Sequence, residues 1–408
     1  MRFAGFFLAL LVVFTLALVY VHRRSAKAFG LSKRGRRALG VALGVSLPLM
    51  LAGRALARLL PGPVLEALAI AGSVMALGIL ISAILLALLD AAGALMKLVR
   101  AGLAKLRDAP SRVLAEPPPA VPETPAIPRR TFIGQAAASS AILAGGGTAL
   151  YGTLFGRHDY IIEEVVVRIP GLARALDGFT IVQLSDLHIG QFVGEPELAA
   201  AVSLVKQARP DLVVLTGDLI DHDVRYADML GAFTRRLSEA AGRAGLYAIP
   251  GNHDYYAGIE KTLAAAARGG ARVLKNAGQV IGDAGGAFAL LGVDDAWGSR
   301  MVRGAGPDLA QALASVPPDL PRVLLAHNPM VFHEAASDVA LQLSGHTHGG
   351  QVNLLLKPAE LLLPYGYFAG VYERGGARLY VNRGFGTAGP PARIGAPPEV
   401  TRIVLVSG

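Results

Sequence analysis

An uncharged apolar run near the N-terminus constrains this chain most strongly. Phe3 to Val21 holds 19 residues without a charged side chain, which is long enough for a helix to cross a hydrocarbon core of about 30 Å. A cleaved signal peptide is the alternative, but its apolar segment is normally shorter. We therefore expect a retained membrane helix at about residues 3–21.

Two further apolar stretches follow, at about residues 38–60 and 64–89. The sequence Pro-Gly-Pro at 61–63 separates them and predicts a tight turn, because proline cannot continue a helix interior. The composition agrees with a membrane protein, since only 17% of the residues are charged, against about 25% in a soluble domain. We expect an all-α transmembrane region over residues 1–100.

A proline-rich segment comes next. Residues 108–130 hold seven prolines, so we expect an extended linker over residues 101–131. A fourth apolar segment, residues 132–156, is rich in Ala and Gly and is a weaker candidate to span the membrane. Arg129 and Arg130 resemble a twin-arginine export motif. The segment is therefore either a fourth transmembrane helix or a signal-like helix.

The net charge of +9 is unevenly distributed. Residues 1–156 hold 17 Lys and Arg against 5 Asp and Glu, whereas residues 157–408 hold 22 against 25. The basic loops at 22–37 and 97–130 should be cytoplasmic. If 132–156 spans the membrane, the C-terminal part is extracytoplasmic in a multi-pass membrane protein; if not, it is cytoplasmic. Because the basic charge sits beside apolar segments, we expect no nucleic-acid-binding surface.

The C-terminal part, residues 157–408, alternates short β-rich runs with helix-like segments, which is typical of βαβ units. Polar clusters follow five of the expected strands, and loops beyond the carboxyl ends of strands build the sites of open α/β sheets. These clusters are Ser185 to His188, Gly217 to Asp218, Gly251 to Asp254, His327 to Pro329 and Gly345 to Gly350.

The clusters offer imidazole, carboxylate and amide groups, and the chain has no cysteine. This donor set suits Mn, Fe, Zn or Co better than Ca or Cu(I). Residues two apart in an extended segment point to the same side, so Asp186 and His188 can act together, as can His346 and His348. One carboxylate can bridge two cations, and two cations about 3.5–4 Å apart can hold a phosphoryl group for in-line attack.

In this order, Asp-x-His, Gly-Asp, Gly-Asn-His-Asp, His and Gly-His-x-His resemble the five motifs of the calcineurin-like metallophosphoesterase superfamily, over about residues 178–350. The sequences GHTHGGQ and LYVNRGFGTAGPPARIGAPPEVTRIVL resemble its membrane-associated bacterial branch, which includes phosphodiesterase-like proteins. The resemblance implies an α/β catalytic domain over residues 157–408 with two packed mixed β-sheets flanked by helices in a four-layer α-β-β-α fold.

The resemblance also implies a role for each motif position. His253 would contact the substrate phosphate and protonate the leaving oxygen, and Asp254 would orient His253 by accepting its other ring N–H. The ligands of two divalent or transition metal ions would be Asp186, His188 and His348 for the first, Asn252, His327 and His346 for the second, and Asp218 for both.

The implied activity is hydrolysis of phosphodiester or phosphoanhydride bonds by in-line attack of a metal-bridging hydroxide. Lipid-linked and cell-envelope phosphoesters are among the substrates that a membrane anchor favours. Two alternatives stay open: a phosphomonoesterase, and a non-hydrolytic membrane scaffold with a structural metal site. The oligomeric state is not predicted.

Several residues outside the motifs have two interpretations. Arg383 and Arg393 are either exposed arginines or partners of an anionic substrate. Asp294 and Asp295 either line the pocket or form a strand-end turn. Residues 352–369 are either a core strand with a buried helix or an amphipathic lip that admits a lipid-linked substrate.

The loop after Asp218 also carries acidic residues. We expect Asp221 and Asp223 to be loop residues near the rim of the site. His222 is expected to be an ordinary surface or turn histidine.

Overall fold

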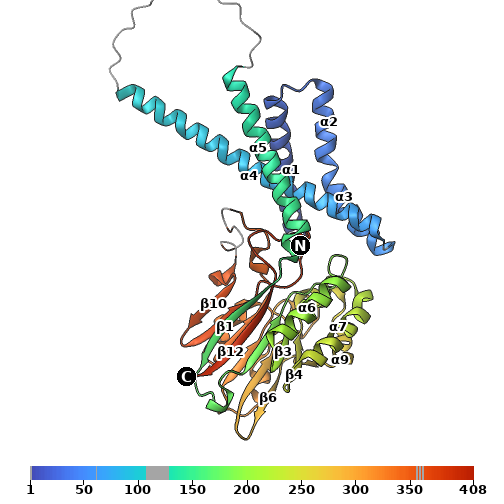
Figure 1. Cartoon of the computed structure of the whole chain (residues 1–408), viewed down its shortest axis with the longest axis vertical. Helices are drawn as coiled ribbons and strands as arrows, with labels where there is room; N and C mark the ends of the chain where they lie inside the picture. The colour runs from blue at the N-terminus through green and yellow to red at the C-terminus, as the bar shows by residue number, and fades with distance from the viewer. Residues whose placement is uncertain (1, 61, 107–127, 355–356, 358–359, 361–362) are drawn as a thin grey trace, which may run out of the picture. The chain divides into compact units, whose positions relative to one another are not determined.

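The computed structural model describes residues 2–60, 62–106, 128–354, 357, 360 and 363–408. The chain forms two compact units, Met1–Tyr151 and Gly152–Gly408. The first is helical and the second is built on two β-sheets (Figure 1).

The N-terminal unit contains long helices. They are α1 (Arg2–Ala28), α2 (Lys33–Gly44), α3 (Ser46–Leu59), α4 (Pro63–Leu106) and α5 (Arg129–Leu154), whose last residues belong to the second unit. Among the described residues, three helical stretches are long and apolar enough to cross a membrane: Leu8–Ala28, Lys33–Leu56 and Pro63–Ala104.

These stretches overlap the three predicted spans, and α4 continues 17 residues beyond the predicted end at residue 89. α5 is not among them, so a fourth span at 132–156 stays a prediction. Most of the predicted linker lies outside the described residues.

Small residues and one polar cluster join the N-terminal helices. A Cβ atom on Gly72 of α4 would lie 2.2 Å from the backbone nitrogen of Met50 in α3, so only glycine permits this approach. Between α1 and α4, the carboxylate of Asp90 accepts hydrogen bonds from Nη2 of Arg24 at 3.0 Å and from the hydroxyl of Tyr20 at 2.8 Å.

Two six-stranded mixed sheets form the second unit, as predicted. The first sheet has the order β1 (Ile161–Ile169), β12 (Glu399–Ser407), β2 (Thr180–Leu184), β3 (Leu212–Thr216), β4 (Gly245–Ile249) and β5 (Arg272–Val273). The second has the order β10 (Gly370–Arg374), β11 (Ala377–Val381), β9 (Leu341–Ser344), β8 (Arg322–Leu325), β7 (Gly286–Gly292) and β6 (Ala277–Asp283). Strands β2 to β5 run parallel in the first sheet, as do β11, β9, β8 and β7 in the second.

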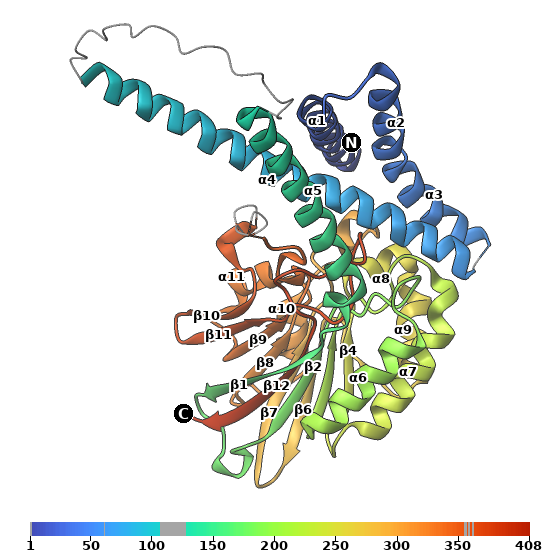
Figure 2. The same cartoon turned by 45° about the horizontal axis from the view of Figure 1, so that its top comes forward.

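Alternate side chains of these strands face opposite layers, as the two-residue period of a strand requires. Ile181 of β2 contributes to the core between the sheets, and Val182 to the core beneath the helices. The helices α6 (Glu195–Ala208), α7 (Ala227–Ala240) and α9 (Ile259–Arg268) cover the first sheet (Figure 2). The second sheet packs against α10 (Leu309–Ala314) and α11 (Phe332–Ala335). The predicted four-layer α-β-β-α fold is therefore confirmed.

Candidate metal centre

The five predicted clusters follow the carboxyl ends of β2, β3 and β4 in one sheet and of β8 and β9 in the other. Backbone hydrogen bonds join the first two loops: the N–H of Asp186 donates to Gly217, and that of His188 donates to Asp218. Because the strands are parallel neighbours within each sheet, their loops meet at one edge of the molecule.

Strained backbone is concentrated at this edge. Nine described residues other than glycine have a positive φ, and five of them are predicted metal ligands. L-residues rarely adopt this conformation, and it persists where the surroundings enforce it, often at functional sites. The five are Asp186, His188, Asp218, His346 and His348.

Two glycines allow the loops to approach the carboxylates. A Cβ atom on Gly345 would lie 2.2 Å from Oδ2 of Asp186, and one on Gly251 would lie 2.3 Å from Oδ1 of Asp218. Any larger residue would displace these carboxylates, so the glycines belong to the construction of the site.

One group of ligand atoms comprises Asp186, His188 and His348. The Nε2 atoms of the two histidines face each other at 3.0 Å, and Oδ1 of Asp186 lies 3.4 Å from Nε2 of His348. All three side chains are buried. The structure therefore brings together the three residues that we assigned to the first ion.

A second group lies beside it. Nε2 of His327 is 3.3 Å from Nδ1 of His346 and 3.3 Å from Oδ2 of Asp218. Oδ2 of Asp218 also lies 3.6 Å from Nε2 of His188, so one oxygen atom borders both groups. Oδ1 of Asn252 is buried and accepts no hydrogen bond.

These donors fit a metal. Nδ1 of His327 donates to the main-chain oxygen of Thr216 at 2.8 Å, which directs Nε2 toward Asp218 in the form that binds a cation. A cation would also satisfy the acceptor of Asn252, whose isolation is otherwise costly in a buried position.

The charges within the cluster oppose one another. Burial, reinforced by the charge of His327, lowers the pKa of His346 to about 3. Burial opposes protonation of His327 as well, but the carboxylate of Asp218 outweighs it and raises the pKa of His327 well above its usual value. A bound cation would take the place of the proton that the carboxylate of Asp218 stabilises on His327.

The environment of His253 corrects one prediction. Nδ1 of His253 donates to the main-chain oxygen of Asp221 at 2.8 Å and lies 3.3 Å from Oδ1 of the same residue. Asp254 does not orient His253. Its carboxylate accepts backbone N–H groups of Leu219, Ile220 and Gly251, because it closes the first turn of α8 (Asn252–Ala257) and ties it to the loop after β3.

Asp221 is the functional candidate that the sequence reasoning missed. Its carboxylate lies between Nδ1 of His188, at 3.4 Å, and Nδ1 of His222, at 2.8 Å, in addition to His253. Burial opposes ionisation, but hydrogen bonds from the three histidines hold the pKa of Asp221 well below its usual value. The sequence feature that could have pointed to Asp221 is its position three residues after Asp218, in the loop that follows β3.

The side chains of the two C-terminal arginines have partners within the protein, and Arg393 is buried rather than exposed. Arg393 is 1% exposed and donates to the main-chain oxygens of Arg383, Gly384 and His348. Its Nη2 also lies 3.1 Å from Nδ1 of His348. Arg383 forms ion pairs with Glu163 and Glu399.

Arg393 also affects a predicted ligand. Burial and then the charge of Arg393 lower the pKa of His348, which favours the neutral imidazole that a metal requires.

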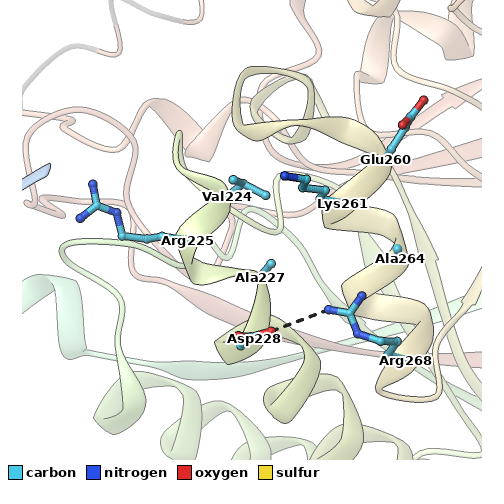
Figure 3. A pocket seen from close by; sticks show the side chains of 8 residues that line it. All are labelled: Val224, Arg225, Ala227, Asp228, Glu260, Lys261, Ala264 and Arg268. Carbon is cyan, nitrogen blue, oxygen red and sulfur yellow. Dashed lines mark ion pairs between the residues drawn. The ribbon is translucent and has the colours of Figure 1, made fainter.

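A cavity of about 610 Å³ adjoins His346. Its lining includes Trp297. The two aspartates before Trp297 form a strand-end turn, in which Asp294 accepts a hydrogen bond from the hydroxyl of Tyr255 and Asp295 accepts one from the N–H of Trp297. Another hollow, beside α7 and α9, has acidic and basic walls and contains none of the predicted ligands (Figure 3). The cavity beside His346 is therefore the candidate for substrate binding.

The sequence of this unit matches a known family. Residues 179–350 match the model of the calcineurin-like phosphoesterase family. The chain is also 34% identical over 283 residues to the uncharacterised metallophosphoesterase YkuE of Bacillus subtilis, covering 67% of this chain and 94% of that protein. This chain belongs to the calcineurin-like phosphoesterase family. The resemblance in the motifs is thus confirmed, and the chain is a metal-dependent phosphoester hydrolase.

Two other relatives of this calcineurin-like phosphoesterase differ in name and length. The phosphodiesterase YaeI of Escherichia coli is 32% identical over 295 residues, which cover 69% of this chain and all of that protein. A transmembrane protein with a metallophosphoesterase domain from Danio rerio is 34% identical over 275 residues, which cover 65% of this chain and 62% of that protein.

Proposed function

We propose that this chain is a membrane-anchored phosphodiesterase with a two-metal centre. The observation that carries the proposal is the position of Asp218, whose Oδ2 lies 3.6 Å from Nε2 of His188 and 3.3 Å from Nε2 of His327. A carboxylate oxygen between two sets of imidazoles is suited to join two cations. The name of YaeI favours a diester over the phosphomonoester alternative.

Each predicted ligand then has a task. The ions, when bound, would lower the pKa of a water between them and neutralise charge on the phosphoryl group. Their ligands would be Asp186, His188 and His348 at one position, Asn252, His327 and His346 at the other, and Asp218 at both. Mn, Fe, Zn and Co suit this donor set.

His253 would donate a proton to the leaving oxygen. Its ring is 16% exposed and lies 4.5 Å, centroid to centroid, from the ring of His188, so it can reach a phosphate at the centre. Asp221 would keep the ring in place, because its main-chain oxygen accepts from Nδ1 of His253 and its carboxylate lies 3.3 Å from the same nitrogen, which leaves Nε2 for the substrate.

We also propose a location in a bacterial cell membrane, with the catalytic unit on the extracytoplasmic side. Three apolar helical stretches and the transmembrane relative support an anchored protein. The relatives YkuE and YaeI support a bacterial source. The side of the membrane depends on whether α5 crosses it.

The test uses the purified full chain. We would assay bis-(p-nitrophenyl) phosphate and p-nitrophenyl phosphate with Mn, Zn, Fe or no added metal, and count bound metal per chain. We expect metal-dependent cleavage of the diester, two metals per chain, and loss of activity in Asp218→Asn. A preference for the monoester would support a phosphomonoesterase.

A His253→Asn variant separates an enzyme from a scaffold. We expect it to retain both metals and lose most turnover. Wild-type protein that holds two metals and cleaves neither ester would contradict the proposed diesterase.

A further inference from the structure

The cavity beside the metal centre carries an inference about the substrate, and this inference rests on the proposed function. His346, a predicted ligand, is also part of the cavity lining. A substrate whose phosphoryl group lies at the metals can therefore extend a substituent into the cavity. The volume of about 610 Å³ is in the range of pockets that enclose a complete small molecule, and is much larger than a phosphate needs.

The described walls of this cavity are mostly apolar. Side chains that give it this character are Trp297, Leu309, Met330, Leu363, Tyr365 and Tyr367. Two charged side chains, Arg300 and Glu334, line it with opposite signs. A highly charged substituent would thus find little compensation here.

Two aromatic walls are held in position. The ring of Tyr365 stacks on that of His333 with centroids 3.9 Å apart, and the guanidinium of Arg300 lies 4.0 Å from the ring centroid of Trp297. Fixed rings reduce the ordering that binding requires. The cavity is therefore built in advance of the ligand.

The rim also exposes apolar surface. Met330 is 37% exposed and Tyr365 is 55% exposed. Met301 and Val302, which directly follow Arg300, are 44% and 47% exposed. Exposed apolar side chains beside a pocket are suited to contact an apolar part of a ligand.

We propose that this cavity binds the hydrocarbon chain of an amphiphilic phosphoester. The walls offer more apolar than polar surface to a ligand, and the apolar rim would continue the contact along a chain too long for the cavity. A substrate anchored in a membrane also suits an enzyme whose own chain carries three apolar helical stretches.

A chain-length series tests this substrate class. We would measure kcat/KM of the metal-loaded full chain in lipid nanodiscs for p-nitrophenyl methyl, butyl and octyl phosphate, below their critical micelle concentrations. We expect kcat/KM to rise about two- to fourfold for each methylene that leaves water. Met330→Ser should flatten this dependence on chain length, because it replaces an apolar wall of the cavity with a polar one.

The matched control is Val166→Ser, because Val166 is 58% exposed on β1 and does not line the cavity. It should keep the wild-type dependence on chain length. Substrate partition into the nanodisc lipid would affect both variants equally, so a difference between them reports the cavity.

Binding can be followed without turnover. The chain has one tryptophan, Trp297, and it lies in the cavity wall. Octylphosphonate, which has no ester bond, should shift its emission, whereas methylphosphonate should not. The shift should require a higher concentration in Met330→Ser and the same concentration in Val166→Ser.

The outcomes distinguish this inference from the proposed function. Metal-dependent cleavage of all three esters with equal kcat/KM, and no emission shift, would overturn the hydrocarbon site and leave the phosphodiesterase standing. A preference for p-nitrophenyl thymidine 5′-phosphate over the octyl ester would assign the cavity to a planar ring instead. No cleavage of any ester by metal-loaded protein would contradict the proposed function itself.

Discussion

Asp221 contacts both kinds of functional histidine. Its Oδ1 lies 3.4 Å from Nδ1 of His188, a predicted ligand, and 3.3 Å from Nδ1 of His253, the proposed proton donor. A carboxylate that accepts the second ring N–H of a ligand fixes the orientation of the imidazole and raises its basicity. One side chain can therefore couple metal affinity to proton transfer.

We predict that Asp221→Asn lowers kcat about 10- to 100-fold at saturating metal and also weakens metal binding. The reason is the loss of charge beside His188 and His253. The measurements are steady-state kinetics and a metal titration. Asp223→Asn is the control in the same loop, because Asp223 pairs with Arg225. If Asp221→Asn reduces kcat further in a His253→Asn background at saturating metal, Asp221 does not act through His253.

Arg393 should matter for stability rather than for substrate binding. Its guanidinium is buried and donates to several main-chain oxygens, so Arg393→Met would leave these acceptors unpaired. We expect a loss of about 3 kcal/mol or more in the free energy of unfolding, which is a fall of about 6–12 °C in Tm of the catalytic unit. Scanning calorimetry of the full chain measures it.

The control for this variant is Arg378→Met. The nearest acidic oxygen to Arg378 is on Glu373, at 3.9 Å, and both side chains are partly exposed. Surface pairs of this kind contribute at most about 1 kcal/mol. An unchanged Tm in Arg393→Met would show that the buried guanidinium does not hold the loops.

The proximity of the proposed ligands was easier to predict from the sequence than the contacts that support them, for a physical reason. The proposed ligands lie directly after strands, and the parallel strand ends bring them to one edge of the sheets. The partner of His253 depends on how the loop after β3 folds back, and no spacing rule describes this. Asp254, adjacent in sequence, forms the first turn of α8 instead, and Asp221 reaches across 32 residues.

At the scale of elements, the start of α8 offers a sharp test. Gly251 and Gly194 both precede helices with extended backbone, at φ −117° and −118°. A Cβ atom would meet Oδ1 of Asp218 at 2.3 Å in the first case, and nothing closer than side-chain atoms of Pro196 and Glu197 at 3.9 Å in the second. The two sites thus share their local conformation and differ in what surrounds them.

We predict that Gly251→Ala abolishes metal binding and activity, because the added methyl group displaces the carboxylate of Asp218. Gly194→Ala should retain both and lose about 1 kcal/mol or less of stability. Metal content per chain and diesterase activity are the measurements. Equal metal content in the two variants would show that the Asp218 carboxylate can move without loss of the centre.

Elements with a strong hydrophobic pattern were predictable, and segments between them were not. The strands before the polar clusters appear where the apolar runs predicted them. Residues 352–369 form neither the strand nor the helix of the first interpretation in their described part: Val352 makes a single β-bridge and Pro364–Gly366 is one 3-10 turn. Their apolar character serves local packing, with Phe368 buried, and the cavity wall at Tyr365. The membrane lip stays a prediction.

For the whole molecule, the open question is the side of the membrane on which the catalytic unit lies. The loop at 22–37 is basic, which predicts a cytoplasmic position. α5 has 26 residues and carries no charged side chain after Arg130, but it is not among the stretches that are long and apolar enough to cross a membrane. The Gly and Ala residues of α5 allow other helices to pack closely against it, and such packing can stabilise a less apolar helix in a membrane.

We predict that α5 crosses the membrane and that the catalytic unit is extracytoplasmic. The chain has no cysteine, so single substitutions can report the side directly. Ser337→Cys lies at an exposed position of the catalytic unit, and Phe29→Cys lies at an exposed position of the basic loop without altering its charge. A membrane-impermeant maleimide should label the first in intact cells and the second only after permeabilisation. Labelling of both positions only after permeabilisation would place the catalytic unit in the cytoplasm. An odd number of crossings would then separate the N-terminus from the active site, which means that α5 does not cross the membrane.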